Sequence, residues 1–446
     1  MSFAALILAA GKSTRMNSDV PKVLHMIAGK PMVQYAIDVV KGIGPDKIAV
    51  VFGDGMQSAA DLIAPVPAIV QHPARGTGHA VMCAREFLSG YNGPVLVLYG
   101  DTPFLTADTL QKMIDSVRSG SGVVILGFYP DDAAQYGRLV LNDTGGLESI
   151  VEFTDCTPQQ KTIAYCNAGL MCIDGKLMPD LLAQLKNDNA KSEYYLTDLV
   201  AIARRKNIPC AAIEVEPHEV MGINTRYQLA LAEQFMQQKL RSKMLEAGAT
   251  LLDPPSVYCS HDTEIGKDVV IEPNVYFGPK VKIGSGVRIK AFSHIEGADI
   301  KSHAVIGPFA RIRPGSVIEN DVHIGNFVEI KNSHLHSGVK AGHLSYLGDS
   351  TVGANSNIGA GTITCNYDGF SKHQTTIGAD AFIGSNTALV APVAVGDGAI
   401  IAAGSVICKN VEADALGIAR AAQESKPGWA KRFKDRMRQR TTKKAV

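Results

Sequence analysis

The C-terminal half of the sequence carries an aliphatic residue at nearly every sixth position between Ile265 and Ile407. A period of six fits neither the 3.6-residue turn of an α-helix nor the two-residue alternation of a strand. It is the period of hexapeptide-repeat solenoids, in which each unit supplies one short strand and one inward-facing residue. Three units close one coil, and the core forms as the coils stack. The sequence therefore predicts a parallel β-helix for this half of the chain.

Three regular runs and one weaker stretch carry the repeat. The repeat positions are Ile265, Ile271, Phe277, Ile283, Ile289 and Ile295, then Ile300, Ile306, Ile312, Ile318, Ile324 and Ile330, then Leu335, Ala341, Leu347, Val352 and Ile358, and finally Ile377, Ile383, Leu389, Val395, Ile401 and Ile407. Glycine directly follows many of them, at Gly266, Gly284, Gly307, Gly325, Gly353, Gly378, Gly384 and Gly396. We expect these glycines at the corners of the coil, where the chain must turn without a Cβ atom. The long spacing from Thr364 to Ile377 predicts a loop that leaves the solenoid.

Length, charge and cysteine usage limit the remaining choices. A chain of 446 residues predicts two or three domains of about 100–200 residues each. The net charge of +1 provides no overall field that would attract nucleic acid or an anionic membrane. The apolar opening (residues 3–10) lacks the basic segment of a signal peptide, and no apolar run is long enough to predict membrane insertion. Eight cysteines without a CxxC pair indicate reduced, mostly buried thiols in a cytoplasmic protein.

The first 225 residues have a different pattern of apolar residues. Apolar runs that predict buried strands (4–8, 48–52, 95–99, 123–128 and 211–215) alternate with segments that predict helices (32–40, 79–88, 109–117 and 194–203). This alternation is typical of a doubly wound α/β domain with a mainly parallel sheet, whose ligands bind at the carboxyl ends of the strands. Residues 226–247 predict one connecting helix ended by Gly248. We therefore expect one domain at 1–225 and a second at 248–446.

The chemistry of the first domain begins directly after its first predicted strand, at Gly11, Lys12 and Arg15. Small residues let backbone N–H groups approach phosphate oxygens, and the two cations add favourable charge. The loop is not a Walker A loop, which would need glycine at Leu6, nor a dinucleotide fingerprint, which would need glycine at Ser13. From the loop alone, a nucleotide phosphate site and an ordinary glycine turn both remain open.

Further motifs follow in a fixed order. They are Leu8-Ala9-Ala10-Gly11, Thr14-Arg15-Met16, Pro21-Lys22-Val23-Leu24, Gln71, Gly76-Thr77-Gly78-His79-Ala80, Tyr99-Gly100-Asp101-Thr102-Pro103, Tyr136-Gly137-Arg138, Glu152, Asn167-Ala168-Gly169 and Gly222-Ile223-Asn224. This series resembles the signature of sugar-1-phosphate nucleotidyltransferases, apart from Ser13, where glycine is usual. Joined to the hexapeptide solenoid, the whole chain resembles the bacterial bifunctional N-acetylglucosamine-1-phosphate uridylyltransferase/glucosamine-1-phosphate N-acetyltransferase family. The resemblance implies a Rossmann-like α/β nucleotidyltransferase domain, a left-handed parallel β-helix and a homotrimer.

For the first domain, the resemblance implies uridylyl transfer from UTP to N-acetylglucosamine 1-phosphate with release of pyrophosphate. Such a reaction needs charge neutralisation and in-line positioning more than covalent help from the protein. Arg15 and Lys22 would be the catalytic cations, and Asp101 and Asn224 would hold Mg²⁺. One carboxylate, an amide oxygen and substrate phosphates form the sparse site that Mg²⁺ prefers, although Asp101 alone is also compatible with a carboxylate that caps a turn. The implied contacts to UTP and to the product are Leu8, Ala9, Ala10, Gly11, Lys22, Gln71, Gly76, Thr77, Tyr99, Gly100, Asp101, Gly137, Glu152, Asn167 and Asn224.

In the solenoid, polar residues concentrate where the repeat is least regular, around Lys331, His343 and residues 357–369. Acetyl transfer from a thioester to a sugar amine needs a base and donors for the oxyanion, and imidazole suits the first task. A single histidine on a solenoid face is equally typical of a solvated surface. The resemblance implies that His343, oriented by Glu329, is the base for acetyl transfer from acetyl-CoA to glucosamine 1-phosphate. It also implies that Arg313, Lys331, Tyr346 and Asn357 bind the amino sugar phosphate, and that Ala360, Asn366, Tyr367, Ser385, Ala403 and Arg420 bind acetyl-CoA.

Two alternative functions remain open. The solenoid could serve only oligomerisation or effector sensing, as in ADP-glucose pyrophosphorylases. The chain could also be a non-catalytic scaffold, like the nucleotidyltransferase-fold subunits of the eukaryotic initiation-factor exchange complex. The His343 motif argues against the first, and the joint presence of Arg15, Lys22 and Asp101 argues against the second. The basic C-terminal stretch predicts a solvated tail rather than a nucleic-acid site, because Phe433 is the only aromatic residue among its charges, Lys431, Arg432, Lys434, Arg436, Arg438, Arg440, Lys443 and Lys444.

Overall fold

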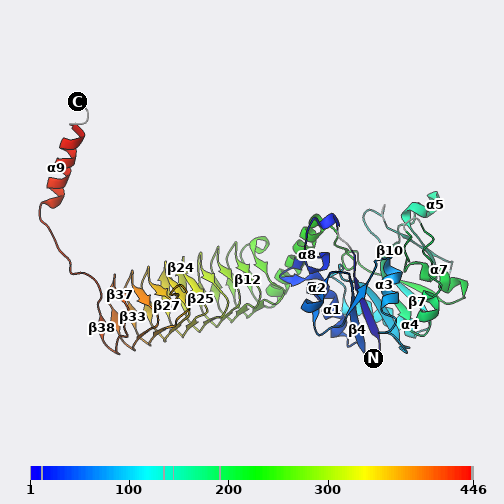
Figure 1. Cartoon of the computed structure of the whole chain (residues 1–446), viewed down its shortest axis with the longest axis horizontal. Helices are drawn as coiled ribbons and strands as arrows, with labels where there is room; N and C mark the ends of the chain where they lie inside the picture. Colours follow the sequence, from blue (N-terminus) through cyan, green and yellow to red (C-terminus); the bar gives the residue numbers. More distant parts are fainter. Residues whose placement is uncertain (1, 12–13, 134–135, 144, 190–191, 443–446) are drawn as a thin grey trace. The chain divides into compact units, whose positions relative to one another are not determined.

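The structure is a computed structural model that describes residues 2–11, 14–133, 136–143, 145–189 and 192–442. The predictions that concern Lys12, Ser13, Lys443 and Lys444 lie outside these ranges. The chain divides into two compact units, Met1–Lys239 and Leu240–Val446 (Figure 1).

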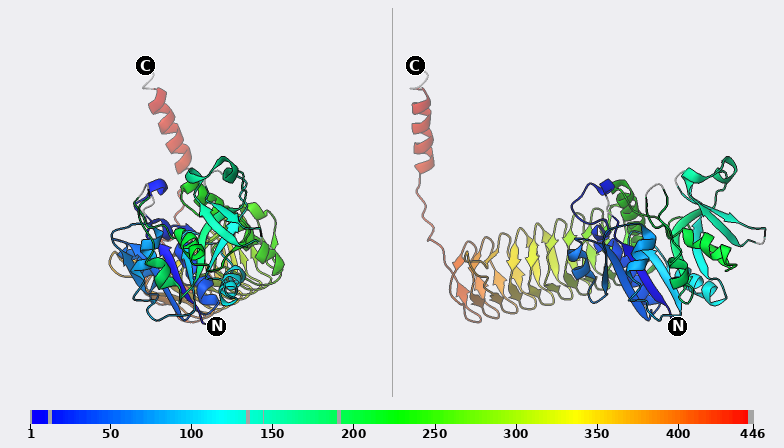
Figure 2. Two further views of the ribbon diagram at one scale, coloured as in Figure 1. Left: turned by 90° about the vertical axis from the view of Figure 1, so that its right-hand side faces the viewer. Right: turned by 45° about the vertical axis from the view of Figure 1, so that its right-hand side comes forward.

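The first unit is built on a mixed sheet with helices on both faces (Figures 1 and 2). The sheet has the order β11 (Cys210–Glu214), β7 (Val123–Phe128), β10 (Cys166–Asp174), β6 (Pro94–Tyr99), β1 (Ala4–Ala9), β4 (Lys47–Gly53) and β5 (Ala68–Gln71). Strand β10 runs antiparallel to β6 and β7, whereas β1 is parallel to β4 and β6. The inner strands are buried on both faces, which explains their continuous apolar sequences.

Alternate residues of β1 face two separate hydrophobic layers. Ala5 and Ile7 pack with helices α1 (Met32–Gly42) and α4 (Ala107–Arg118). Leu6 packs in the opposite layer, with α3 (Thr77–Cys83), α6 (Met178–Leu182) and α7 (Asp198–Arg205). The remaining elements of this unit are β2 (Met26–Ile27), β3 (Lys30–Pro31), α2 (Gln57–Ile63), the hairpin β8 (Arg138–Leu141) and β9 (Leu147–Val151), α5 (Pro158–Lys161), and the 3₁₀ helices η1 (Thr14–Met16), η2 (Lys22–Leu24) and η3 (Phe153–Asp155).

The predicted α/β fold class is confirmed, and the predicted strands coincide with β1, β4, β6, β7 and β11. Two helix predictions need correction. The segment predicted at 79–88 is the shorter α3, and the one predicted at 194–203 begins at Asp198. The later start of the second helix follows from a backbone pairing, since the N–H of Tyr194 donates to Arg75 O (2.8 Å) and the N–H of Gly78 donates to Tyr194 O (2.8 Å). This pairing holds Tyr194 outside the helix and against the start of α3.

The second unit is the predicted solenoid, a parallel β-helix of stacked coils (Figures 1 and 2). Its first face consists of β12 (Thr250–Leu251), β15 (Val270–Ile271), β18 (Arg288–Ile289), β21 (Val305–Ile306), β24 (His323–Asn326), β27 (Lys340–His343), β30 (Asn357–Ile358), β33 (Phe382–Ile383), β36 (Ile400–Ile401) and β38 (Leu416–Gly417). The second face consists of β13 (Tyr258–Cys259), β16 (Tyr276–Phe277), β19 (His294–Ile295), β22 (Arg311–Ile312), β25 (Glu329–Lys331), β28 (Tyr346–Gly348), β31 (Ile363–Cys365), β34 (Ala388–Val390) and β37 (Val406–Ile407). The third face consists of β14 (Glu264–Ile265), β17 (Lys282–Ile283), β20 (Ala298–Ile300), β23 (Ser316–Ile318), β26 (His334–Leu335), β29 (Ser350–Val352), β32 (Thr375–Ile377) and β35 (Val393–Val395).

The repeat residues stack inward, as the period predicts. Nearly all of them belong to one buried cluster that runs through the coils, and Ile265 packs against it. The residue before each repeat position faces outward, so Tyr276 and Lys282 are exposed beside the buried Phe277 and Ile283. The loop expected between Thr364 and Ile377 is present between β31 and β32.

The expectation that the repeat glycines form the corners is wrong for most of them. The left-handed backbone angles lie three residues after the repeat position, often on non-glycine residues such as Asp268 (φ 58°), Asn274 (φ 59°) and Phe292 (φ 60°). The glycines serve close approach between coils instead. A Cβ at Gly325 would lie 1.8 Å from the carbonyl oxygen of Gly342, on the next coil. These positions are small because neighbouring backbones meet there.

Two helices complete the chain. Helix α8 (Arg226–Glu246) is the long helix that the sequence predicts, and Gly248 follows it with φ 94°. Helix α9 (Trp429–Thr442) occupies the basic stretch that was expected to be a tail, and its described side chains are exposed. The 3₁₀ helix η4 (Pro254–Ser256) lies between β12 and β13 in the first coil of the solenoid. Across the described ranges, the helices are too short or too polar to span a membrane.

Candidate active sites

Two adjoining clefts open at the carboxyl ends of β1 and β6 in the first unit. The first cleft has a volume of about 530 Å³ and the second about 580 Å³. Tyr99 and Asp101, at the end of β6, line both. The predicted residues in the first cleft are Leu8, Ala9, Ala10, Gly11, Lys22, Gln71, Gly76 and Thr77. Those in the second cleft are Arg15, Gly137, Glu152, Asn167 and Asn224.

Lys22, Asp101 and Asn224 meet between these clefts. The Lys22 ammonium donates to the Asp101 carboxylate and to Asn224 Oδ1 (2.9 Å). The Lys22 and Asp101 side chains are only 12% and 18% exposed, so their ion pair is shielded from water. The backbone fixes the same group, because the N–H of Ile223 donates to Asp101 O (3.1 Å). One carboxylate and one amide oxygen thus converge on a cation, a donor set that also fits Mg²⁺.

The second cleft has hydroxyl, carboxylate and amide groups on its wall. Burial, followed by the charges of Asp101 and Glu152, raises the pKa of Tyr99 well above its usual range. Tyr99 therefore keeps its proton as a potential hydrogen-bond donor. The N–H of Asn167 donates to Gly137 O (2.8 Å), which joins β10 to the segment before β8. These contacts give the cleft a polar wall suited to a ligand rich in hydroxyl groups.

Two motif residues support the clefts without lining them. Gly100 donates its N–H to Leu8 O (2.9 Å), and a Cβ there would press on Val23 and Ala9 at 3.2 and 3.3 Å. Gly100 therefore allows the ends of β1 and β6 to lie close together. Arg138 is buried, with its guanidinium donating to Ala133 O (2.6 Å) and to the carbonyl of Tyr136. These two hydrogen bonds hold the segment before β8 in place.

The first cleft is shaped by hydrogen bonds within its own wall. Gln71 is buried at the end of β5 and donates to Gly76 O (2.9 Å). Gly76 has φ 96°, and a Cβ there would lie 2.6 Å from Tyr194 O. Thr77 Oγ1 accepts from the N–H of Leu196 (3.1 Å). The side chains of Gln71 and Thr77 are thus held by the protein, and alanine and glycine residues line much of the rest of this wall.

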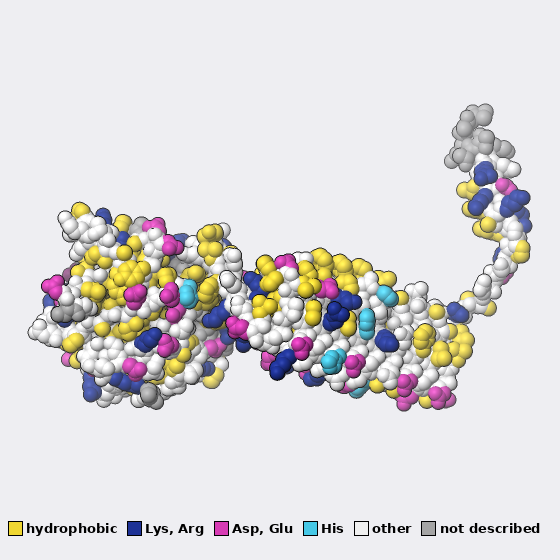
Figure 3. Space-filling model, turned by 180° about the vertical axis from the view of Figure 1, so that it is seen from behind, with side chains coloured by type: hydrophobic (Ala, Val, Ile, Leu, Met, Phe, Trp, Pro, Cys, Tyr) yellow, Lys and Arg dark blue, Asp and Glu magenta, His cyan; other side chains and the backbone are white. Residues whose placement is uncertain are grey.

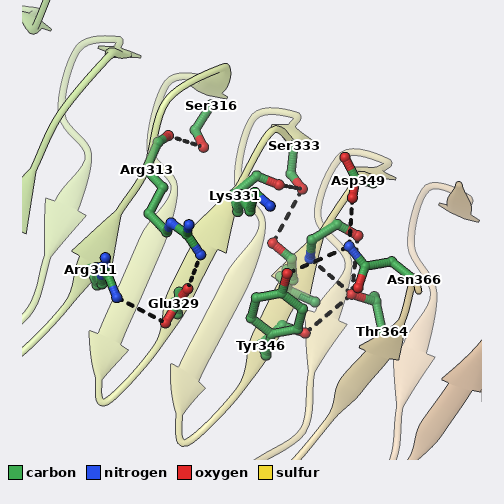
Figure 4. A network of polar contacts seen from close by, with 12 residues as sticks. Arg311, Arg313, Ser316, Glu329, Lys331, Ser333, Tyr346, Asp349, Thr364 and Asn366 are labelled. Carbon is green, nitrogen blue, oxygen red and sulfur yellow. Dashed lines mark hydrogen bonds and ion pairs between the residues drawn. The ribbon is translucent and has the colours of Figure 1, made fainter. Parts of the chain in front are cut away.

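A polar network crosses the second face of the solenoid (Figure 4). Glu329 accepts from Arg313 (2.8 Å) and lies 3.9 Å from Arg311. Asn366 Nδ2 donates to Asp349 Oδ2 (2.5 Å) and contacts Tyr346 Oη (3.5 Å). The strands β22, β25, β28 and β31 supply this surface in consecutive order, so the parallel register aligns the side chains.

Lys331 stands in this network beside two other cations. A hydrogen-bonding contact with Lys372, burial, and the charges of Lys372 and Arg313 together lower the pKa of Lys331. Lys372 lies in the loop between β31 and β32, where an isolated bridge pairs it with Tyr367. Because the neighbouring cations disfavour the charge of Lys331, an anion bound here would favour it, and this cluster suits a phosphate group.

His343 lies at the end of β27, on the first face. Its Nδ1 is 2.6 Å from Asn326 Oδ1, and the parallel pairing of β24 with β27 places these residues in register. An amide oxygen only accepts, so Nδ1 carries the hydrogen and Nε2 is available to take a proton. The expected orienting contact from Glu329 is absent among the hydrogen bonds of the described residues, because that carboxylate binds Arg313 instead.

Three of the residues assigned to acetyl-CoA lie in a row with His343, whereas Asn366 and Tyr367 follow β31 on the second face. The repeat positions Ala341, Ile358, Ile383 and Ile401 pair in register on successive coils. Two residues after them stand His343, Ala360, Ser385 and Ala403, and Asn357 begins the strand β30 within the same stack. Arg420 closes the row by donating to Ala403 O (2.8 Å). Four coils thus form one continuous edge that starts at His343.

Comparison with known proteins covers both units. Residues 5–195 match the MobA-like NTP transferase domain, and residues 262–297, 297–332 and 374–409 match the bacterial transferase hexapeptide family. The chain is 53% identical over 442 residues to the bifunctional protein GlmU of Rhodospirillum rubrum, covering 99% of each chain. It is 51% identical over 449 residues to that of Ruegeria sp. (100% of each). It is also 49% identical over 443 residues to that of Paramagnetospirillum magneticum, which covers 99% of this chain and 98% of the relative.

The chain belongs to the GlmU family. This membership confirms the resemblance read from the motif series, together with the predicted combination of a nucleotidyltransferase fold and a left-handed β-helix. The match extends over both units, so neither is an unrelated addition to a GlmU-like half.

Sequence reasoning missed several residues that line the sites of this GlmU-family chain. Glu193 and Tyr195 border the first cleft, because the pairing of Tyr194 with the start of α3 carries them there. Asn326 contacts His343, and Lys372 approaches Lys331. Asn326 carried a usable signal, since it stands two residues after the repeat position Ile324, as His343 does after Ala341. The other three lie in segments without a repeat to place them.

Proposed function

We propose that this chain makes UDP-N-acetylglucosamine in two steps at two separate sites. The solenoid transfers acetyl from acetyl-CoA to glucosamine 1-phosphate, and the α/β unit then transfers uridylyl from UTP to N-acetylglucosamine 1-phosphate. The main support is that one chain contains both sites: Lys22, Asp101 and Asn224 meet between two clefts, and His343 and a cluster of three cations lie on stacked coils of the solenoid. These features match the chemical needs of the two reactions.

In the uridylyl transfer, UTP occupies the first cleft and the sugar phosphate occupies the second. A phosphate oxygen of the sugar attacks the α-phosphorus of UTP, and the bond to pyrophosphate breaks. Asp101 and Asn224 would hold Mg²⁺, which neutralises charge on the phosphates. Lys22, already anchored between these ligands, and Arg15 balance the charge of the leaving pyrophosphate. The attacking phosphate is already anionic, so this step needs no protein base.

In the acetyl transfer, the sugar amine attacks the thioester carbonyl and the CoA thiolate leaves. His343 Nε2 takes the amine proton, while Asn326 holds the ring through Nδ1. Arg313, Lys331 and Lys372 neutralise the sugar phosphate. Tyr346 and Asn357 complete the sugar contacts. Acetyl-CoA runs along the row of Ala360, Ser385 and Ala403 toward Arg420. Asn366 and Tyr367, which follow β31 on the second face, are assigned to the same ligand.

We further infer that the solenoid works as a homotrimer. An apolar ridge of Phe292, Phe309, Phe327 and Leu344 follows one corner of the coils, and these side chains are 45–61% exposed. The three phenylalanine rings stack at 4.9 and 5.2 Å, and Figure 3 shows hydrophobic side chains grouped along the solenoid surface. The ridge reaches His343, since Leu344 is the next residue. A second copy packed on this ridge would bury it and enclose an acetyl-CoA molecule that one edge cannot surround.

We place these reactions in the cytoplasm, where UTP and acetyl-CoA are available. The cysteine residues are compatible with a reducing compartment. The eight cysteines lie within the described ranges, and none of them is in a disulfide there. Burial raises the pKa of Cys259 to about 12 and that of Cys210 to about 11. Such thiols stay protonated and unreactive at neutral pH.

A coupled assay tests the proposed function. Purified full-length protein receives glucosamine 1-phosphate, acetyl-CoA, UTP and Mg²⁺, and both free CoA thiol and pyrophosphate are measured. We expect thiol release without UTP, and pyrophosphate release that requires acetyl-CoA. A second reaction starts from N-acetylglucosamine 1-phosphate and should release pyrophosphate without acetyl-CoA. Pyrophosphate without thiol release would favour a solenoid used only for assembly, and no product in either reaction would favour a scaffold.

A further inference from the structure

A cluster of two histidines and one carboxylate stands on the third face of the solenoid. His334 Nε2 lies 2.7 Å from Glu319 Oε1, and His336 Nδ1 lies 3.1 Å from the same oxygen. The nearest ligand-type atoms of all three residues lie within 4.8 Å of one another. Neither proposed reaction uses these residues, because the residues assigned to acetyl transfer come from the first and second faces, the loop after β31 and the segment after β38.

The register of the coils explains why these side chains meet. Strands β23 and β26 pair in parallel, with Val317 opposite His334 and Ile318 opposite Leu335. Ile318 and Leu335 are buried, so the residues on either side of them face outward. His334 and His336 therefore project from the same side of one coil, and Glu319 projects beside His336 from the coil before. The arrangement is built by the backbone and does not depend on flexible loops.

The hydrogen bonds around Glu319 leave one of its carboxylate oxygens to contact both imidazole rings. Ser337 donates through its hydroxyl (3.1 Å) and its N–H (3.2 Å) to Glu319 Oε2, which directs Oε1 toward the histidines. The two rings stack at a centroid distance of 4.2 Å. On the preceding coil, Lys301 follows Ile300, which pairs with Ile318, and its ammonium is held by Asp299 at 2.6 Å. Hydrogen bonds that orient a ligating carboxylate in this way are typical of the groups around metal ligands.

We propose that Glu319, His334 and His336 bind one Zn²⁺ ion per chain. Imidazole nitrogen and carboxylate oxygen are ligands that zinc takes, and three protein ligands with water in the remaining position make a complete site. The three side chains are 30–40% exposed, so water can supply that position and the ion can enter from solvent.

The consequence of binding is a link between two coils. Glu319 belongs to the coil that carries Arg313, and His334 and His336 belong to the coil that carries Lys331. The ion would link these two coils through side chains on the third face, in addition to the backbone pairing of β23 with β26. It therefore has a structural role, separate from the Mg²⁺ at Asp101.

Isothermal titration of metal-free full-length protein with ZnCl₂ tests the site, with excess Mg²⁺ present to occupy other oxygen ligands. The double variant His334→Gln/His336→Gln should lose one equivalent of zinc binding per chain. His294→Gln removes an outward histidine from the second face and should bind zinc like wild type. Ser337→Ala should weaken binding by about tenfold or more, because it removes an orienting contact. Equal stoichiometry and affinity in wild type and the double variant would overturn the proposal.

Cobalt provides a spectroscopic check. Co²⁺ added to wild type should give a visible ligand-field absorption that is missing from the double variant and lost when Zn²⁺ is added. Both transfer activities and the thermal unfolding of the metal-free double variant should match wild type, which shows that the substitutions leave the fold intact. Identical Co²⁺ spectra in wild type and the correctly folded double variant would refute the assigned ligands.

Discussion

The two units bring their polar side chains together in different ways. In the α/β unit, Lys22, Asp101 and Asn224 are far apart in sequence and meet because separate loops converge at the carboxyl edge of one sheet. In the solenoid, His343 and Asn326 meet because they hold the same place on successive coils. The first site depends on the placement of several loops, whereas the second depends on one repeated contact between coils.

This difference has a practical consequence for how each site fails. A substitution at the α/β site should remove the function of one side chain and leave the sheet intact. A substitution that disturbs the stacking of coils should displace every group aligned along the same edge. The four predictions below test this contrast in order of decreasing effect.

The largest effect is expected from His343→Ala. The variant loses the proposed base, and general-base catalysis contributes about 10²–10⁴-fold to rate. Acetyl transfer, measured as CoA thiol release, should fall by that factor, while pyrophosphate release from UTP and N-acetylglucosamine 1-phosphate should stay near the wild-type rate. Asn326→Ala should lower acetyl transfer less, because it removes only the contact that orients the ring. Unchanged acetyl transfer in His343→Ala would exclude this residue as the base.

Asp101→Asn should produce the reciprocal result. The substitution removes the charged ligand of the proposed Mg²⁺ site, so uridylyl transfer should fall by about 100-fold or more and depend more steeply on Mg²⁺ concentration. Acetyl transfer should be unaffected. Asp54→Asn is a matched control, because Asp54 also follows a strand of the same sheet but is 71% exposed and pairs only with His72 among the salt bridges of the described residues. Equal losses in both variants would assign the effect to general electrostatics.

More of the solenoid than of the α/β unit could be predicted from the sequence, and the reasons are physical. A period of six has one compatible architecture, so the inward residues of the solenoid follow from spacing alone. The row of His343, Ala360, Ser385 and Ala403 follows from the same register. The strands of the α/β unit could also be read, because buried parallel strands are continuously apolar.

The sequence could not predict contacts between segments that are not related by a repeat or a common periodicity. The Tyr194 backbone pairs with Arg75 and Gly78, which shortens a predicted helix and carries Glu193 and Tyr195 to the first cleft. The carboxylate of Glu329 binds Arg313 rather than His343, a choice that depends on which face each strand occupies. The prediction for the repeat glycines was also wrong, because glycine occurs both at tight corners and where two backbones lie in close contact.

Gly325→Ala tests that close contact between coils. A Cβ at Gly325 would overlap the carbonyl oxygen of Gly342, whereas a Cβ at Gly342 would have no atom within 4 Å. We expect Gly325→Ala to destabilise the solenoid by about 1–3 kcal/mol or more through overpacking, and Gly342→Ala to have little effect on stability. Thermal unfolding followed by circular dichroism measures both. Acetyl transfer should fall in Gly325→Ala while uridylyl transfer persists, and equal stability of the two variants would contradict the assigned contact.

The smallest effect is expected when the pH is lowered and His25, in the first unit, comes to bind a proton. Burial, followed by the charge of Arg226, lowers the pKa of His25, and the Arg226 guanidinium lies 3.2 Å from His25 Nδ1. The folded unit therefore keeps this imidazole neutral at pH values where the unfolded chain, with a pKa near 6.5, already binds a proton. Because the unfolded state binds more protons, the free energy of unfolding must decrease as the pH falls below about 6.5. Denaturant unfolding of the first unit between pH 7.5 and 5 should be less pH-dependent in His25→Gln than in wild type, by at most one proton. An unchanged slope would mean that His25 titrates equally in both states, and that the loops converging on Met16 and His25 are more open to water than their burial indicates.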